Sequence, residues 1–106
     1  MAELEVTFHN EATIRVQAQI FAGRALVSTS VADPGETIVL RAESAPYDIY
    51  FKNSATGWEI TRKLNSEAET VTLRRQAGRY VIVAGKHSRR DANRDGRSEQ
   101  SKETRP

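Results

Sequence analysis

The sequence predicts an all-β fold, an antiparallel β-sandwich of about seven or eight short strands, and three observations support this class. Apolar and polar side chains alternate with the period of two that a half-buried β-strand requires. Turn residues interrupt the alternation at short intervals, and no segment shows a helical period. The expected strands cover residues 4–8, 14–20, 25–31, 38–42, 47–52, 58–64, 69–75 and 79–84.

The sandwich is expected to occupy residues 1–85 as one domain, followed by a flexible charged tail over residues 86–106. A chain of 106 residues has room for a single core. Every Val, Ile, Leu, Met and aromatic residue lies within the first 83 positions. The tail therefore lacks the side chains that would build a core of its own.

The first two strands are predicted from simple alternation. Leu4, Val6 and Phe8 alternate with polar side chains until the turn-forming residues His9 and Asn10. The second strand has one apolar and one polar face along its whole length, which makes it the clearest strand in the sequence.

The third strand follows a tight turn at residues 22–23. A two-residue turn there sets Ile20 opposite Ala25 and Ile14 opposite Val31. Because this register gathers apolar side chains on one face, pairing and burial agree.

The fourth and fifth strands each follow a proline. Residues 33–36, Asp-Pro-Gly-Glu, predict a type II turn, because proline sets φ at its second position and glycine accepts positive φ at its third. Pro46 stands where a strand can begin without losing a hydrogen-bond donor. Tyr47, Ile49 and Phe51 then alternate with the more polar side chains between them.

The sixth and seventh strands are expected to form a hairpin. Its register pairs Ile60 with Leu73 on the inner face and Glu59 with Arg74 on the outer face, where opposite charges meet. Arg62 is the residue of the sixth strand that does not fit an apolar face.

The eighth strand is a nearly continuous apolar run, which predicts a central strand covered on both faces. At its start, the Gly78-x-Tyr80 arrangement resembles the tyrosine corner of immunoglobulin-like and transthyretin-like sandwiches. In those folds the phenol hydroxyl ties the strand to a neighbouring loop. The resemblance implies a sandwich of this kind and no function.

Charge is divided unevenly along the chain, whose net charge is +2. Residues 1–85 carry nine Lys and Arg against ten Asp and Glu, whereas residues 86–106 carry seven against four. The basic pI of about 9.2 therefore reflects the tail. Contact with nucleic acid, if the protein makes any, is expected mainly from the tail.

The composition favours a cytoplasmic protein without a membrane span. The chain has no cysteine, which suits a reducing compartment. Glu3 and Glu5 lie where a secretory signal needs a basic start and an apolar run. No stretch approaches the roughly 18 consecutive apolar residues of a membrane span.

Motifs for catalysis or for a cofactor are not recognisable, so we expect neither an enzyme nor a bound cofactor. His9 and His87 are the two histidines, and neither has a sequence neighbour that suggests acid-base chemistry.

One short motif in the tail is typical of calcium binding. Asp91, Asn93 and Asp95 match the first ligand positions of an EF-hand-type loop. The match ends there, because Lys102 stands where the loop needs a bidentate acid. We therefore expect no metal site.

Two groups of residues are candidates for contact with a partner. Aromatic residues near the loop at residues 53–57 are interpreted either as core and rim or as a platform for a sugar or peptide. Arg62 and Arg75 are expected on the side of Trp58, where a guanidinium can stack on the indole. The candidate partner-binding residues are Tyr47, Tyr50, Trp58, Arg62, Arg74, Arg75, Arg89, Arg90, Arg94 and Arg97.

These observations favour a non-enzymatic protein-binding or assembly module, an accessory subunit of a larger complex whose tail adds charged contacts. Two alternatives stay open. One is a lectin-like module that binds a ligand through Trp58 and the nearby tyrosines, and the other is nucleic-acid binding through the tail.

Overall fold

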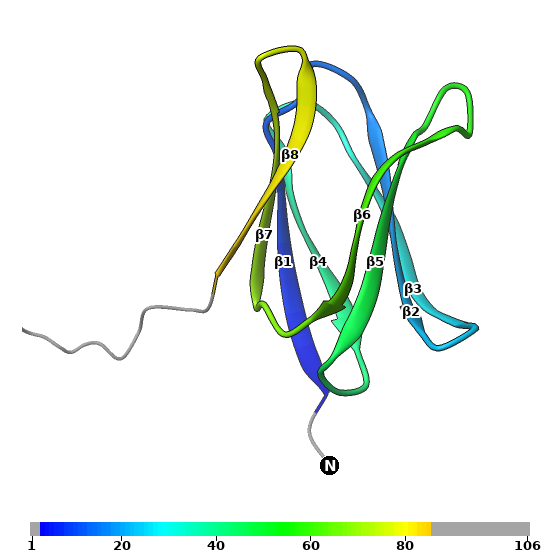
Figure 1. Cartoon of the computed structure of the whole chain (residues 1–106). Helices are drawn as coiled ribbons and strands as arrows, with labels where there is room; N and C mark the ends of the chain where they lie inside the picture. Colours follow the sequence, from blue (N-terminus) through cyan, green and yellow to red (C-terminus); the bar gives the residue numbers. More distant parts are fainter. Residues whose placement is uncertain (1–2, 86–106) are drawn as a thin grey trace, which may run out of the picture.

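The computed structural model describes residues 3–85, which form eight β-strands in two four-stranded sheets (Figure 1). The strands are β1 (Leu4–Asn10), β2 (Val16–Ala22), β3 (Ala25–Ala32), β4 (Thr37–Ala42), β5 (Tyr47–Asn53), β6 (Glu59–Ser66), β7 (Thr70–Gln76) and β8 (Arg79–Gly85). This architecture confirms the predicted all-β sandwich. Residues 3–85 contain no helix, so none in this range is long and apolar enough to cross a membrane.

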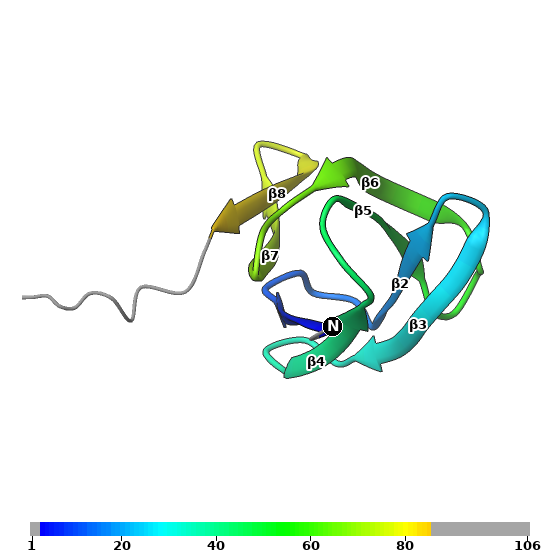
Figure 2. The same cartoon turned by 90° about the horizontal axis from the view of Figure 1, so that it is seen from below.

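The strands are ordered β4-β1-β7-β8 in the first sheet and β3-β2-β5-β6 in the second. Figure 2 shows the two sheets as facing layers. Hairpins join β2 to β3, β5 to β6 and β7 to β8, whereas the other connections cross between the sheets. Neighbouring strands are antiparallel except for β1 and β7, which run parallel.

The core lies between the layers and follows the predicted alternation. Tyr47, Ile49 and Phe51 of β5 are all buried, and the residues between them are more exposed. Phe8 of β1 meets Phe51 across the two sheets, with ring centroids 4.9 Å apart. The other fully buried apolar side chains are Val6, Val16, Ala18, Ile20, Ala32, Leu40, Ala42, Val71 and Leu73.

The predicted register of the β2–β3 hairpin is wrong for two reasons. The turn lies at Gly23 and Arg24 instead of residues 22–23, so Ala22 pairs with Ala25. A bulge then shifts the register once more, and Ile20 pairs with Ser28 instead of Ala25. A bulge inserts one extra residue into one strand and exchanges its faces beyond that point. Val31 is therefore 36% exposed.

The turn at residues 33–36 is confirmed. The amide of Glu36 donates to the carbonyl of Asp33 at 2.9 Å, which closes the turn, and Gly35 has a φ of 84°. This turn carries the chain from the second sheet to the first.

The predicted hairpin between the sixth and seventh strands does not form. β6 pairs with β5 in the second sheet, and β7 pairs with β1 and β8 in the first. Ile60 therefore does not pair with Leu73, and Glu59 does not pair with Arg74. Parallel pairing with a distant strand leaves no local sequence signal, whereas a short polar connection looks like a hairpin turn.

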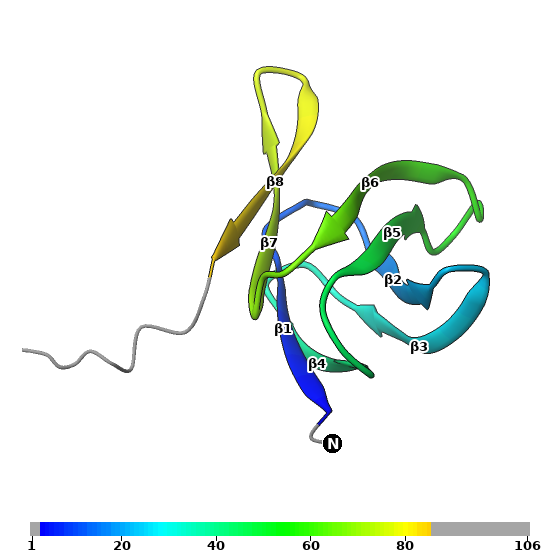
Figure 3. The same ribbon diagram turned by 60° about the horizontal axis from the view of Figure 1, so that its bottom comes forward.

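The prediction that the eighth strand is central is also wrong, because β8 is the outer strand of the first sheet. Val83 of β8 is 43% exposed. Figure 3 shows the β7–β8 hairpin extending past the end of the sandwich.

The hydroxyl tie expected from Tyr80 is made by Tyr47 instead. The buried Tyr47 hydroxyl donates to the carbonyl of Ala68 at 2.6 Å, which fastens β5 to the connection between β6 and β7. Burial raises the pKa of Tyr47 above its ordinary value, and this effect outweighs the lowering by a hydrogen bond with Ser66.

The Tyr47→Phe variant is expected to lose about 1–2 kcal/mol of stability at pH 7, because the buried carbonyl of Ala68 loses its donor. The raised pKa means that the folded state favours the neutral phenol. The stability that the neutral Tyr47 phenol contributes is complete below its pKa in the unfolded chain, which is about 10. This contribution is lost as the pH rises through the higher pKa that the phenol has in the folded protein. Urea unfolding at pH 7 and above pH 10 should therefore show a smaller alkaline loss in the variant than in the wild type. Equal alkaline losses would contradict this assignment.

Candidate functional site

The aromatic platform predicted near residues 53–57 does not form. Tyr47 is only 2% exposed and belongs to the core, whereas Tyr50 lies on the outer face of the second sheet. Trp58, just before β6, is 75% exposed. Because side chains alternate along a strand, an odd spacing of three residues places Tyr47 and Tyr50 on opposite faces.

The structure also separates the predicted domain arginines. Arg62 lies over the Tyr50 ring, 5.4 Å from its centroid, and its Nε donates to Glu59 at 2.8 Å. Arg75 lies over the ring of Tyr80 at 5.0 Å. The expected stacking of Arg62 and Arg75 on the indole is therefore wrong.

Arg74, the third of these arginines, belongs to another neighbourhood. Its Nε donates to the carboxylate of Glu11 at 2.8 Å. Glu11 also lies 3.6 Å from Nε2 of His9, whose Nδ1 is 2.7 Å from the hydroxyl of Thr37. Each arginine thus has a local partner, and the three do not make one binding patch.

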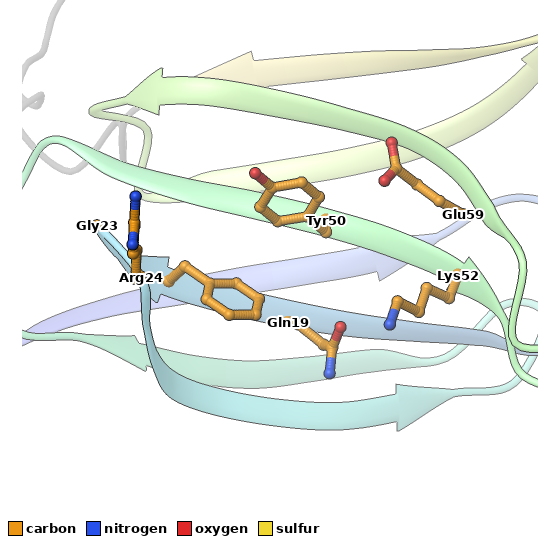
Figure 4. A pocket seen from close by; sticks show the side chains of 7 residues that line it. Gln19, Gly23, Arg24, Tyr50, Lys52 and Glu59 are labelled. Atoms are coloured by element: carbon orange, nitrogen blue, oxygen red, sulfur yellow. The ribbon is translucent and has the colours of Figure 1, made fainter.

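An open pocket of about 430 Å³ lies on the outer face of the second sheet (Figure 4). Phe21 and Tyr50 form an edge-to-face pair in it, with ring centroids 5.3 Å apart. Figure 4 shows Arg24 and Lys52 towards opposite ends of this pocket. The lining residues are Gln19, Phe21, Gly23, Arg24, Tyr50, Lys52 and Glu59.

Sequence reasoning missed Phe21, although the sequence contained a signal for it. Phe21 follows the inward-facing Ile20 directly, so the alternation of the strand sends this ring to the outer face. The lining has polar groups for hydrogen bonds but no histidine, cysteine or serine. Its acid, Glu59, is engaged by Arg62. Its aromatic faces and polar groups are suited to binding a ligand.

The tail residues predicted as sites lie outside the described residues. These are the arginines Arg89, Arg90, Arg94 and Arg97, and the calcium-loop candidates Asp91, Asn93 and Asp95. Within residues 3–85, no three His, Cys, Asp or Glu side chains gather in a way that would hold a metal ion.

The second candidate surface is the outer edge of β8, which has no hydrogen-bonded strand beside it in the described domain and has β6 as its neighbour in the second sheet. Of the other outer strands, β3 and β4 lie beside each other, where the Arg41 amide donates to the Ser28 hydroxyl at 3.3 Å. β6 carries Arg62 and Lys63, and its pairing with β5 has two register shifts. Charges and bulges of this kind discourage the addition of another strand. β8 pairs with β7 without a shift, and its residues 80–85 include no charge and no proline.

The backbone of β8 has unused hydrogen-bonding groups along that edge. The turn between β7 and β8 has two residues, Ala77 and Gly78, both with positive φ, so Gln76 and Arg79 flank it as a hydrogen-bonded pair. In an antiparallel ladder the backbone amide and carbonyl of every second residue, counted from Arg79, point towards β7. The amides and carbonyls of the remaining residues, Tyr80, Ile82 and Ala84, point away from β7. Together with the valine side chains of β8, these groups are called the β8 edge below.

Comparison with known proteins gives no relative: no family model matches the chain, and neither a curated protein nor a solved structure matches it.

Proposed function

We propose that this protein is a non-enzymatic protein-binding or assembly module, an accessory subunit that docks through the β8 edge. The observation that carries the proposal is the contrast between β8 and the other outer strands of the described domain. An edge with unpaired backbone groups and no charge, proline or bulge is a template for another strand. Addition of a strand to such an edge is an established mode of protein recognition.

The side chains of the edge support the same proposal. Val81 and Val83 alternate with Tyr80 and Ile82 along β8, so both faces of this outer strand carry apolar groups. Main-chain hydrogen bonds would supply affinity for a partner strand, and contacts with these side chains would supply selectivity. In this proposal the charged segment at residues 86–106, which follows β8 directly, adds electrostatic contacts to the same partner.

The test compares one substitution on each outer strand of the first sheet. Val83 of β8 is 43% exposed and Val39 of β4 is 55% exposed. Val83→Lys places a charge on the proposed docking edge, whereas Val39→Lys places the same charge on the shielded edge. Each full-length protein is isolated under mild conditions from the cells that make it, and its mass is measured by light scattering.

The wild type and Val39→Lys are expected to elute in a complex above the mass of the monomer. Val83→Lys is expected to weaken that complex roughly ten-fold or more, which corresponds to about 1.4 kcal/mol. Circular dichroism should show the same sheet content in all three proteins. A monomeric wild type, or equal effects of the two lysines, would contradict docking through β8.

A further inference from the structure

We infer that the strand which docks on the β8 edge is β8 of a second copy, in antiparallel register about a two-fold axis at Ile82. This inference rests on the proposed function and names its partner. The pairing would join the two first sheets into one continuous sheet of eight strands. It is isologous, because each copy contributes the same surface, and it closes as a dimer.

The outward backbone groups of β8 fit this register. Tyr80, Ile82 and Ala84 are evenly spaced about Ile82, so an antiparallel second copy sets Ile82 against Ile82 and Tyr80 against Ala84. Residues in these positions are hydrogen-bonded pairs, and each exchanges two backbone bonds. Every outward amide and carbonyl of these three residues therefore finds a partner.

The side chains of β8 fit the same register. Val81 of one copy lies opposite Val83 of the other, at the closer spacing of a non-hydrogen-bonded pair. The valines of both copies then form one patch on the outer face and cover the exposed Val83. On the inner face, the Tyr80 ring of one copy meets the small, exposed Ala84 of the other.

Charge does not oppose the pairing. Arg79 is the charged residue of β8, and the register sets it against Gly85 of the second copy, so no like charges meet in the ladder. The chain's own residues 86–106 are a poor alternative occupant, because they contain no Val, Ile, Leu, Met or aromatic residue to cover the valines. Self-pairing of β6 would bring its Arg62 and Lys63 to the interface.

The absence of cysteine from the chain allows a direct test of the register. Val81→Cys and Val83→Cys are prepared as full-length proteins, one with a mass tag, and are oxidised mildly either alone or as a mixture. The mixture is expected to give roughly ten-fold more disulfide-linked dimer than either protein alone, because position 81 faces position 83 of the other copy. A mixture of Val39→Cys with Val83→Cys serves as the control and is expected to stay unlinked.

Sedimentation of the purified wild type is the second measurement. A dimer at micromolar concentration, converted to monomer by Val83→Lys but not by Val39→Lys, supports the inference. Equal linkage in the single and mixed samples, or a purified wild type that stays monomeric at hundreds of micromolar, overturns it. If that monomer still forms a Val83-dependent complex in its own cells, the second copy is wrong and the proposed function stands; if no such complex forms, both are wrong.

Discussion

Replacing Asn10 with alanine is expected to lower the free energy of unfolding by about 4 kcal/mol, because several buried polar groups lose their partners together. Asn10 ends β1 and has no exposed surface. Its side-chain Nδ2 donates to the carbonyls of Ile14 at 2.9 Å and Ala32 at 3.0 Å, and its Oδ1 accepts from the Ala12 amide at 2.9 Å. One side chain thereby fastens the ends of β1 and β3 to the loop that enters β2.

Asn53 provides a matched control, because it makes the same local turn at the surface. Its Oδ1 accepts from the Ala55 amide at 2.9 Å, as Oδ1 of Asn10 does from Ala12, but in an exposed loop where water can replace it. Asn53→Ala is therefore expected to cost less than about 1 kcal/mol. Urea unfolding of both variants measures the difference, and losses of similar size would show that Asn10 is not the buried hub described above.

The difference in burial between Asn10 and Asn53 could not be predicted from the sequence. Asn10 and Asn53 both follow an apolar alternation and both precede an Asx-turn, so each looks like the polar end of a strand. Only the fold places the main chain of β3 beside Asn10 and encloses it. Burial of a polar side chain by distant segments has no local sequence signal.

The alternation of apolar and polar residues correctly predicted which side chains face the core, but it did not predict which strands pair. It identified the inward residues of β5 because a strand with one buried face has a period of two. Partners depend on the topology, and the parallel pairing of β1 with β7 joins residues about sixty positions apart, such as Thr7 with Thr70. The bulge in β3 and the crossing after β6 lie outside what alternation can report.

For the candidate surfaces, too, the sequence indicates which way side chains face but not which strands lie beside each other. The spacing of Tyr47 and Tyr50 already places them on opposite faces, so the sequence contained evidence against the aromatic platform. The apolar run of β8 predicted a covered strand, whereas the single chain leaves it at an edge. In the dimer that we propose, β8 would lie at the centre of an eight-stranded sheet, which is the kind of position for which such a run is typical.

The contact between Phe8 and Phe51 gives the second large prediction, because these rings join the two sheets. Both are fully buried, and their centroids lie 4.9 Å apart. Phe51→Ala is expected to cost about 4 kcal/mol through lost burial and the cavity that it leaves. Phe21→Ala is the control of the same type on the outer face, where its partly exposed ring contacts Tyr50, and it is expected to cost about 1 kcal/mol.

A double-mutant cycle then isolates the contact between the sheets. Leucine is the better replacement here, because two alanines would remove most of the stability of a small domain. Phe8→Leu and Phe51→Leu should each cost about 1–2 kcal/mol, and the double variant should lose about 1 kcal/mol less than the two single losses combined. The deficit arises because either substitution alone already removes the ring pair. Urea unfolding of the four proteins gives the coupling energy, and losses that simply add would mean that the rings do not stabilise each other across the sandwich.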